Sequence, residues 1–539
     1  MEYIPTWLRF LDAACQLGPR PVLLAAWDRA PPARALARRA LADRAVPAGP
    51  FWPEALPPAP ALPPDHRQAV LARAAALGPM DWHGPFAAEA PALGLNLFDP
   101  GDVRPVWERN RWAELVLLAQ AQRLEPGGGH GARAGAMLAD WAARNPPFRG
   151  PNWASGQEAA LRVLHLALAL DRAVLPAGAR ALVGLHGRRI AATPAYAMAQ
   201  DNNHAISEPA GLLACGLLLG EGDWVALGAD RLAVTEWLRR RHGLPPAPPD
   251  PAPVLWLQRL VAAETGEAPR LGHQDGSAFA DLSLAGPADA RPSVERAARM
   301  LAGRSAGYGD DLGCAWLGLA AGPVLEPLPA EWVAEGLRGW HSGALRAVLR
   351  TGPLRFRPAH ADLLHLDLWD GPRNLLRDGG TGSYNPWQRA LWATAGHNTV
   401  EFDGRDQMPS LSRFLHSHWP RCGMLPEGGW LQDHRGNRQE RRVRLEERLC
   451  RVEDRLAGPW RQAALRWRLA PGTWRLTADG VEGPLARLRL AADAPLALAL
   501  EAGVESPAYG VIQPVPVLVA RLAAPARWVE TVITVPTQQ

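Results

Sequence analysis

The chain has 539 residues, of which 47% are hydrophobic and 21% are charged, which is the composition of a globular protein too long for one core. Its formal net charge is only +4, so charge gives no strong case for binding nucleic acid. The five cysteines are scattered without a CxxC spacing and predict neither a disulfide framework nor a zinc finger.

Residues 1–100 are rich in alanine and proline and are predicted to form a separate N-terminal region. Within it, the proline-dense stretch from Pro47 to Pro64 predicts an irregular connector. The first 24 residues lack a basic segment followed by a clean apolar run, so no signal peptide is predicted. No apolar run approaches the length of a membrane span, and no transmembrane segment is expected.

From Trp107 to about Leu319, apolar residues recur at the i, i+3, i+4 spacing of helices. Short breaks of glycine, proline and asparagine separate most of these segments. Successive antiparallel helix pairs of this kind close into a toroid or stack as a solenoid. The predicted helices are 107–124, 156–175, 179–198, 207–219 and 224–241.

An Asp-Asn-Asn-His segment, residues 201–204, stands just before a strongly apolar helix. Ser207 is the predicted N-cap of that helix, and Pro209 suits its first turn. Asn203 and His204 would then lie beside a helix N-terminus, where amide donors and the helix dipole favour an anion. The alternative is a polar loop whose histidine is simply hydrogen-bonded.

After about residue 326 the apolar residues alternate with polar ones, as in strands. A helical half followed by a strand half predicts two separate domains. Two imidazoles and a carboxylate stand at predicted strand ends and turns, and they would either bind a metal such as zinc or form a hydrogen-bonded network. These three are His360, Asp378 and His397. The predicted strands are 363–369, 399–402, 443–449, 464–469, 473–477, 486–490 and 528–535.

Taken together, these motifs resemble the heparinase II/III-like family of polysaccharide lyases, and in particular a bacterial branch associated with exopolysaccharide. The resemblance rests on the shared order of short motifs across both halves of the chain. They are residues 107–111, Asp140-Trp141, Asn152-Trp153, Glu158, Arg162, Asn202-Asn203-His204, Glu208, His360-Ala361-Asp362, Asp378, residues 397–400, Asp403-Gly404 and residues 451–454.

The resemblance implies an N-terminal incomplete (α/α) toroid, residues 101–325, followed by a C-terminal antiparallel β-sandwich, residues 326–539. The implied reaction is β-elimination at a uronic acid of an acidic polysaccharide. The enzyme must neutralise the uronate, remove the C5 proton and protonate the leaving O4. The resemblance also implies a periplasmic or other extracytoplasmic location, whereas the lack of a signal peptide leaves a cytoplasmic one open.

Residue roles follow from the same resemblance. Asn203 matches the amide that neutralises the uronate, and His204 matches the imidazole that acts as a base or stabilises charge. The residues expected to contact substrate are Arg162, Asn152, Trp153 and Glu208. The cluster expected to hold one divalent metal, zinc, is His360, Asp378 and His397.

One family feature is missing from the sequence. The segment that carries the family's catalytic tyrosine, downstream of the Asn-His motif, has no counterpart, because no tyrosine lies between Tyr196 and Tyr308. If Tyr384 or His204 substitutes, the protein is an active lyase. The alternatives are a catalytically degenerate glycan-binding protein of exopolysaccharide metabolism, a structural partner in polysaccharide export, or glycoside hydrolysis by paired carboxylates, Glu158 and Glu208.

Overall fold

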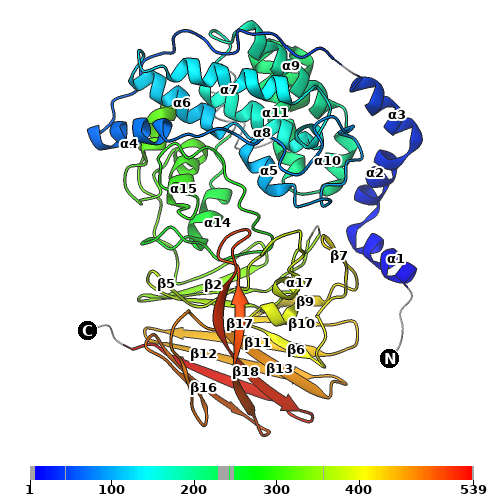
Figure 1. The fold of residues 1–539 in the computed structure, drawn as a ribbon. Coiled ribbons are helices and arrows are strands. Elements are labelled where there is room, and N and C mark those ends of the chain that lie inside the picture. The colour runs from blue at the N-terminus through cyan, green and yellow to red at the C-terminus, as the bar shows by residue number, and fades with distance from the viewer. Residues whose placement is uncertain (1–5, 43, 229–241, 243–247, 356, 537–539) are drawn as a thin grey trace. The chain divides into compact units, whose positions relative to one another are not determined.

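The computed structural model describes residues 6–42, 44–228, 242, 248–355 and 357–536. The chain divides into two compact units (Figure 1). The helical unit comprises Pro19–Leu255 and Ser277–Leu325. The β unit comprises Met1–Gly18, Trp256–Gly276 and Glu326–Gln539. The prediction of a helical half followed by a strand half is confirmed.

The helical unit is organised around its most buried helix, α8, which packs against α6, α9 and α11. Nearly every residue of α8 is buried, since its side chains are apolar or small on almost all sides. The helices of this unit are α2 (Pro19–Arg29), α3 (Pro31–Ala40), α4 (Pro64–Ala75), α5 (Arg104–Arg109), α6 (Ala113–Leu124), α7 (His130–Arg144), η1 (Pro151–Trp153), α8 (Gly156–Ala169), α9 (Ala177–Ala191), α10 (Pro194–Gln200), α11 (His204–Leu219), α12 (Gly222–Gly228), α15 (Arg291–Ala297), η2 (Ala298–Ala302) and α16 (Leu312–Leu317). Helix α14 (Ala252–Leu260) joins the two units.

Several predicted helices are shorter than expected. The predicted helix 107–124 is broken between α5 and α6, where Trp112 has a φ of 66° in the left-handed region. The predicted helix 179–198 is divided by Pro194, because the residue before a proline is disfavoured in the helical conformation. The predicted helix 156–175 ends at Ala169. The predicted helix 224–241 coincides with α12 as far as Gly228, and its remainder lies outside the described residues.

A buried arginine stands at the centre of the helical core. The guanidinium of Arg162 lies over the rings of three tryptophans at 5.1 to 5.9 Å. It also donates a hydrogen bond to Nε2 of His186 at 2.8 Å. Such cation–π contacts stabilise a charge that has been removed from water. The three tryptophans, all fully buried, are Trp112, Trp141 and Trp153.

The β unit contains a five-stranded, an eight-stranded and a four-stranded antiparallel sheet, with a small two-stranded one. Their strand orders are β1-β2-β3-β4-β5, β14-β15-β16-β19-β12-β11-β10-β9, β17-β18-β13-β6 and β7-β8. The strands are β1 (Glu331–Ala334), β2 (Leu337–Ser342), β3 (Leu345–Arg350), β4 (Leu366–Asp370), β5 (Arg373–Leu376), β6 (Val400–Phe402), β7 (Ser410–Ser412), β8 (Leu415–His416), β9 (Arg421–Leu425), β10 (Gly428–Gln432), β11 (Arg438–Glu446), β12 (Leu449–Ala457), β13 (Gln462–Arg468), β14 (Arg475–Leu476), β15 (Gly480–Glu482), β16 (Arg487–Ala492), β17 (Ala497–Glu505), β18 (Gln513–Ala523) and β19 (Trp528–Thr534). Its helices are α1 (Thr6–Leu17), α17 (Arg389–Trp392) and the short η3 (Thr394–Gly396).

One hydrophobic core joins the three larger sheets of the β unit, with contributions from β3, β4, β12, β13, β18 and β19. Six of the predicted strands overlap observed ones: β4, β6, β13, β14, β16 and β19. The seventh predicted strand, 443–449, overlaps β11 in its first four residues. It then crosses the turn between β11 and β12, where Glu446 pairs with Leu449.

Arg441 of β11 is the central buried charge of the β unit. Its Nε and Nη2 atoms donate to the two carboxylate oxygens of Asp454 at 2.8 and 2.9 Å. Its Nη1 atom donates to the backbone carbonyls of Leu364 and Asn398. Both members of the ion pair are fully buried, so the pair fixes two loops to the sheet.

We expect Arg441→Ala to lower the free energy of unfolding of the β unit by about 3–5 kcal/mol, because it leaves the buried Asp454 carboxylate unpaired. Urea unfolding followed by circular dichroism measures this loss. Arg521→Ala is the control, since Arg521 forms an exposed ion pair with Glu501 and should change stability little. Equal losses in both variants would contradict the role assigned to Arg441.

Candidate functional site

The Asp-Asn-Asn-His segment forms the tight turn between α10 and α11. Asp201 has a φ of 48°, and this left-handed residue ends α10. The side-chain oxygen of Asn202 accepts a hydrogen bond from the backbone N–H of His204 at 3.1 Å, and α11 begins at His204. The predicted N-cap role of Ser207 is therefore wrong. Its hydroxyl lies in the first turn of α11 and donates to the carbonyl of Asn203 at 2.8 Å.

The N-terminus of α11 does not offer free amides to an anion. The backbone N–H groups of Ala205, Ile206 and Ser207 already donate to the carbonyls of Asn202 and Asn203. The predicted anion site at this helix end is therefore wrong. A carboxylate bound at this turn would therefore have to be neutralised by side chains.

Asn203 supplies such a side chain. It is exposed, and its amide makes no hydrogen bond within the described part of the chain. It lines a cavity of about 880 Å³ in the helical unit. The walls of this cavity come from α8, from the start of α11 and from residues 277–301, and most of the lining side chains are apolar.

The arginines that line this cavity are already engaged. Among the described residues they form the ion pairs Arg73–Asp281 at 3.9 Å, Arg111–Glu158 at 2.7 Å and Arg296–Asp311 at 3.7 Å. An acidic ligand would therefore meet compensated guanidinium groups, which attract an anion less than unpaired ones do.

Glu158 does not fit the role of a general acid. Burial by itself would raise the pKa of this carboxyl, but its charge and hydrogen bonds with Arg111 hold the pKa below its usual value. A glycosidase acid must be protonated near neutral pH. The pair of Glu158 and Glu208 proposed for hydrolysis is thus disfavoured by the structure.

Glu208 instead orients the imidazole of His204. Its Oε1 atom lies 2.9 Å from Nδ1 of His204, and the carboxylate is almost fully buried. If Nδ1–H donates to this carboxylate, the lone pair of the neutral imidazole lies on Nε2. Gly156, the first residue of α8, makes room for the pair, because a Cβ there would stand 2.4 Å from Oε2 of Glu208.

A tyrosine that the sequence did not single out lies beside this histidine. The ring of Tyr196, on α10, meets the ring of His204 edge-on with centroids 5.7 Å apart, and Tyr196 is exposed. The buried Arg189 lies near Tyr196 and Glu208: burial lowers the pKa of its guanidinium, while Glu208 and Tyr196 act in the opposite direction. The available signal was the position of Tyr196 only eight residues before His204, on its upstream side.

Three residues predicted to contact substrate lie inside the helical core. Asn152, Trp153 and Arg162 have no exposed surface. The amide of Asn152 donates to the carbonyl of Trp82, and the indole of Trp153 donates to the carbonyl of Asn145. These contacts correct the prediction, since the side chains hold the core together and offer a glycan no surface.

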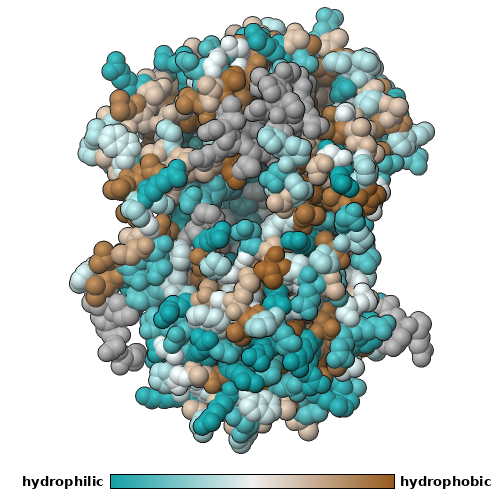
Figure 2. Space-filling view, turned by 180° about the vertical axis from the view of Figure 1, so that it is seen from behind, coloured by the Kyte–Doolittle hydropathy of each residue, from teal (hydrophilic) through white to brown (hydrophobic). Residues whose placement is uncertain are grey.

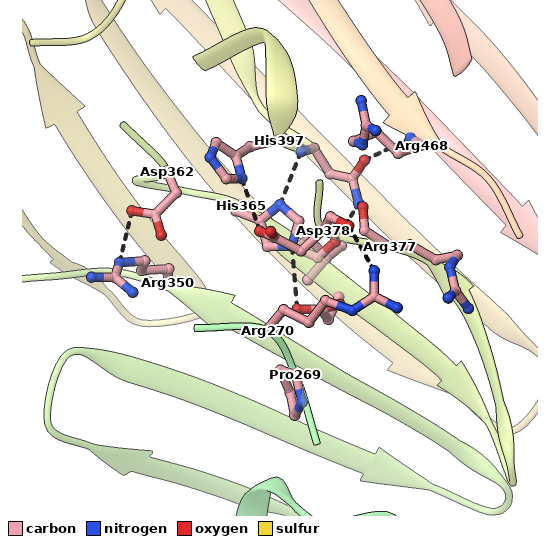
Figure 3. Close-up of polar contacts among 12 residues, drawn as sticks. Pro269, Arg270, Arg350, Asp362, His365, Arg377, Asp378, His397 and Arg468 are labelled. Carbon is pink, nitrogen blue, oxygen red and sulfur yellow. Dashed lines mark hydrogen bonds and ion pairs between the residues drawn. The ribbon is translucent and has the colours of Figure 1, made fainter. Parts of the chain in front are cut away.

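The β unit brings together the other predicted cluster. Ligand atoms of His360, Asp378 and His397 all lie within 4.8 Å of one another. Figure 3 shows Asp378 and His397 directed towards each other, and their Oδ2 and Nδ1 atoms are 2.8 Å apart. Burial by itself would raise the pKa of Asp378, but His397 and His365 hold it well below its usual range.

Unpartnered nitrogens make this cluster suited to a cation. Both ring nitrogens of His360 and Nε2 of His397 are buried without a hydrogen-bond partner. Burial, reinforced by His273 and His397, keeps the pKa of His360 well below its usual value, so one of its ring nitrogens has a lone pair available. Neutral imidazoles and a carboxylate are ligands that zinc prefers. The donor set therefore fits a divalent metal.

Two further histidines of this cluster were missed in the sequence. His365 lies 3.6 Å from Asp378, and His273 meets the ring of His360 edge-on at 5.2 Å. Both nitrogens of His273 are also buried without a partner. His273 belongs to residues 256–276, far from the cluster in sequence, so no spacing pattern could reveal it.

Tyr384, the predicted substitute for the family tyrosine, lies in the β unit. It is almost buried, and its ring packs against those of Trp392, Phe414 and Tyr509. Its backbone N–H donates to the hydroxyl of Tyr509 at 2.8 Å. Asn203 belongs to the other unit.

Comparison with known families identifies the C-terminal region. Residues 329–529 match the sequence profile of the family described as heparinase II/III-like, C-terminal. This region is a heparinase II/III-like domain. The family resemblance expected from the sequence is thereby confirmed, whereas the branch associated with exopolysaccharide stays a prediction. No curated protein matches the sequence.

Solved structures extend the likeness to the whole chain. A heparinase III is 13% identical, with a TM-score of 0.64, covering 96% of this chain and 92% of its own. A heparinase III gene product is 14% identical, with a TM-score of 0.55, covering 97% and 92%. A mutant heparan sulfate lyase from Pedobacter heparinus is 15% identical, with a TM-score of 0.50, covering 96% and 88%. The likeness shows the fold: an incomplete (α/α) toroid followed by an antiparallel β-sandwich, as predicted.

Two buried histidines of the helical unit are held in the neutral state. His165 donates from Nδ1 to the carbonyl of Arg111 at 2.7 Å and accepts at Nε2 from the N–H of Ala280 at 3.0 Å. Nδ1 of His186 bonds to a carbonyl of its own helix, and its Nε2 accepts from Arg162. A second proton on either ring would face a donor.

Because of these two histidines, we expect the free energy of unfolding to fall in acid. Burial lowers the pKa of His165 to about 4, and burial together with Arg162 lowers that of His186 well below its usual value. Above about pH 6.5 both histidines are neutral in the folded and in the unfolded chain. Below about pH 6.5 only the unfolded chain takes up the protons. Each histidine therefore lowers the free energy of unfolding by about 1.4 kcal/mol for each pH unit. For His165 this loss continues down to about pH 4.

Urea unfolding at several pH values measures this slope. We expect His165→Gln to make this slope shallower by about 1.4 kcal/mol per pH unit between about pH 6.5 and about pH 4, because glutamine does not titrate. An unchanged slope in His165→Gln would show that this histidine is charged in the folded protein.

Proposed function

We propose that the helical unit catalyses β-elimination at a uronic acid of an acidic polysaccharide. The observation that carries the proposal is that three groups lie at or beside one turn. These are the amide of Asn203, which makes no hydrogen bond within the described residues, the imidazole of His204 next to it, oriented by Glu208, and Tyr196, whose ring contacts that imidazole. The fold shared with heparinase III and heparan sulfate lyase supports the same reaction class.

Each group has a distinct task in this reaction. The amide of Asn203 donates a hydrogen bond to the uronate and stabilises the negative charge that develops when C5 loses its proton. Nε2 of His204 accepts that proton, while Glu208 stabilises the resulting imidazolium. The C4–O4 bond breaks as the C4=C5 bond forms, and the hydroxyl of Tyr196 donates a proton to O4.

The charges in the cavity favour a substrate of modest charge density. Because its arginines are each paired with a carboxylate, they add little attraction for sulfate groups. The apolar wall instead suits the faces of sugar rings. We therefore expect an unsulfated uronate polysaccharide to be the better substrate.

The test is the ultraviolet absorbance of the conjugated C4=C5 bond during incubation with heparosan, heparan sulfate and alginate. We expect heparosan to be cleaved faster than heparan sulfate, which shares its backbone but carries sulfate. Tyr196→Phe and Asn203→Asp should each lower kcat/KM by about 10²- to 10⁴-fold, because each removes a group that acts in the transition state. Tyr384→Phe is the matched control and should retain activity.

The outcomes separate the alternatives. Loss of activity in Tyr384→Phe but not in Tyr196→Phe would assign the phenol to the β unit. No absorbance change, with glycan binding retained and abolished by Asn203→Asp, would favour the catalytically degenerate glycan-binding protein. Neither cleavage nor binding would leave only the fold assignment.

We also propose that His360, Asp378 and His397 hold one zinc ion. The bound ion would neutralise Asp378 and cross-link the segments that carry the three ligands. Elemental analysis of the purified protein should give about one zinc per chain. His360→Ala should remove the metal and lower the melting temperature. The control His434→Ala should keep both, since His434 lies outside the cluster. Stoichiometric zinc in His360→Ala would overturn the assignment.

A further inference from the structure

The cavity of about 880 Å³ that Asn203 lines has a single aromatic residue in the described part of its wall, Phe279. Of the surface of this residue, 44% is exposed. On the face of the protein shown in Figure 2, hydrophobic residues are scattered among hydrophilic ones, whereas the lining of this cavity is mostly apolar. An exposed aromatic ring in an apolar cavity of this size is typical of a ligand-binding site.

The chain segment that carries Phe279 is anchored to the helical unit. The backbone N–H of Ala280 donates a hydrogen bond to Nε2 of His165 on α8 at 3.0 Å. The side chains of Ala280 and Leu282 belong to a small buried core with Val116, whereas Phe279 is exposed. The ring of Phe279 thus stands on a fixed segment and lies outside that core.

One face of the Phe279 ring is already covered by a second ring. It stacks on the imidazole of His165, with the ring centroids 4.2 Å apart and an angle of 24° between the planes. His165 is fully buried, and both of its ring nitrogens are hydrogen-bonded, one to the carbonyl of Arg111 and the other to the N–H of Ala280. The imidazole is therefore fixed in orientation, and it supports the phenyl ring from below.

We infer that Phe279 stacks on one sugar ring of the polysaccharide held in this cavity, an inference that rests on the proposed function. The face of an aromatic ring carries partial negative charge, which attracts the C–H groups of a sugar. A pyranose whose substituents are all equatorial, such as β-glucuronic acid, presents only C–H groups on both faces. Phe279 is therefore a substrate-binding residue for such a sugar, and it lines the same cavity as Asn203 from a different segment.

The alternative is a phenylalanine that only shields His165 from water. That role needs apolar cover but no aromatic ring, so leucine would fulfil it. Stacking on a sugar needs a flat ring, which tyrosine supplies and leucine does not. The two roles therefore respond differently to Phe279→Leu and Phe279→Tyr.

Calorimetric titration of the full-length protein with an unsulfated heparosan hexasaccharide tests the role of Phe279. The titrations use the Tyr196→Phe background, so that cleavage is slow. We expect Phe279→Leu to raise the Kd about tenfold, because it removes the aromatic face, whereas Phe279→Tyr should stay within about twofold. With Tyr196 intact, Phe279→Leu should raise KM by a similar factor and change kcat little, since stacking binds the substrate and the transition state alike.

The matched control is Trp27→Leu. Trp27 is an exposed aromatic residue of α2 that does not line the cavity, so this variant should bind like the parent protein. Circular dichroism and the melting temperature establish that each variant is folded.

The outcomes separate the role of Phe279 from the proposed reaction. An unchanged Kd in Phe279→Leu would overturn the stacking role even if β-elimination proceeds, and so would equal weakening by Phe279→Tyr. Heparosan binding that depends on the aromatic ring, without any cleavage by the wild type, would keep the stacking role and reject the reaction. Absence of heparosan binding by the wild type would overturn both.

Discussion

Both units depend on buried arginines that satisfy loop carbonyl groups. A buried carbonyl without a donor costs free energy, and these arginine side chains supply the donors. In the helical unit, Arg162 and Arg189 donate to three consecutive carbonyls, those of Asn152, Trp153 and Ala154. In the β unit, Arg441 donates to two loop carbonyls while Asp454 balances its charge. Arginine suits this task because its planar fork presents several donors at once.

The hydrogen bonds from these buried arginines also fix the geometry of the candidate site. The carbonyls held by Arg162 and Arg189 belong to the segment that leads into α8. At the start of α8, Gly156 leaves room for the Glu208 carboxylate, which in turn orients His204. Arg162, which was expected to touch substrate, thus supports the site from inside the core. The side chain that lines the cavity at this turn is that of Asn203.

The sequence located the parts of the site that are close together along the chain or that share the family's motifs. Asn203 and His204 are adjacent. The cluster of His360, Asp378 and His397 was found because its motifs follow one another along the chain in the same order as in the family. Tyr196 was not predicted because the expected tyrosine follows the Asn-His motif, whereas Tyr196 precedes it. His273 was not predicted because only folding brings it to a cluster that lies more than eighty residues away in sequence.

By itself, the sequence determined the class of each half, because helical and strand periodicities are local properties of the chain. It also determined the family through the order of its motifs. Tertiary structure alone decided which polar residues are accessible. Arg162 is enclosed by tryptophans and Glu158 is paired with Arg111, while Asn203 makes no hydrogen bond within the described residues and lines the cavity. Accessibility depends on which distant side chains pack against a residue, and no local pattern carries that information.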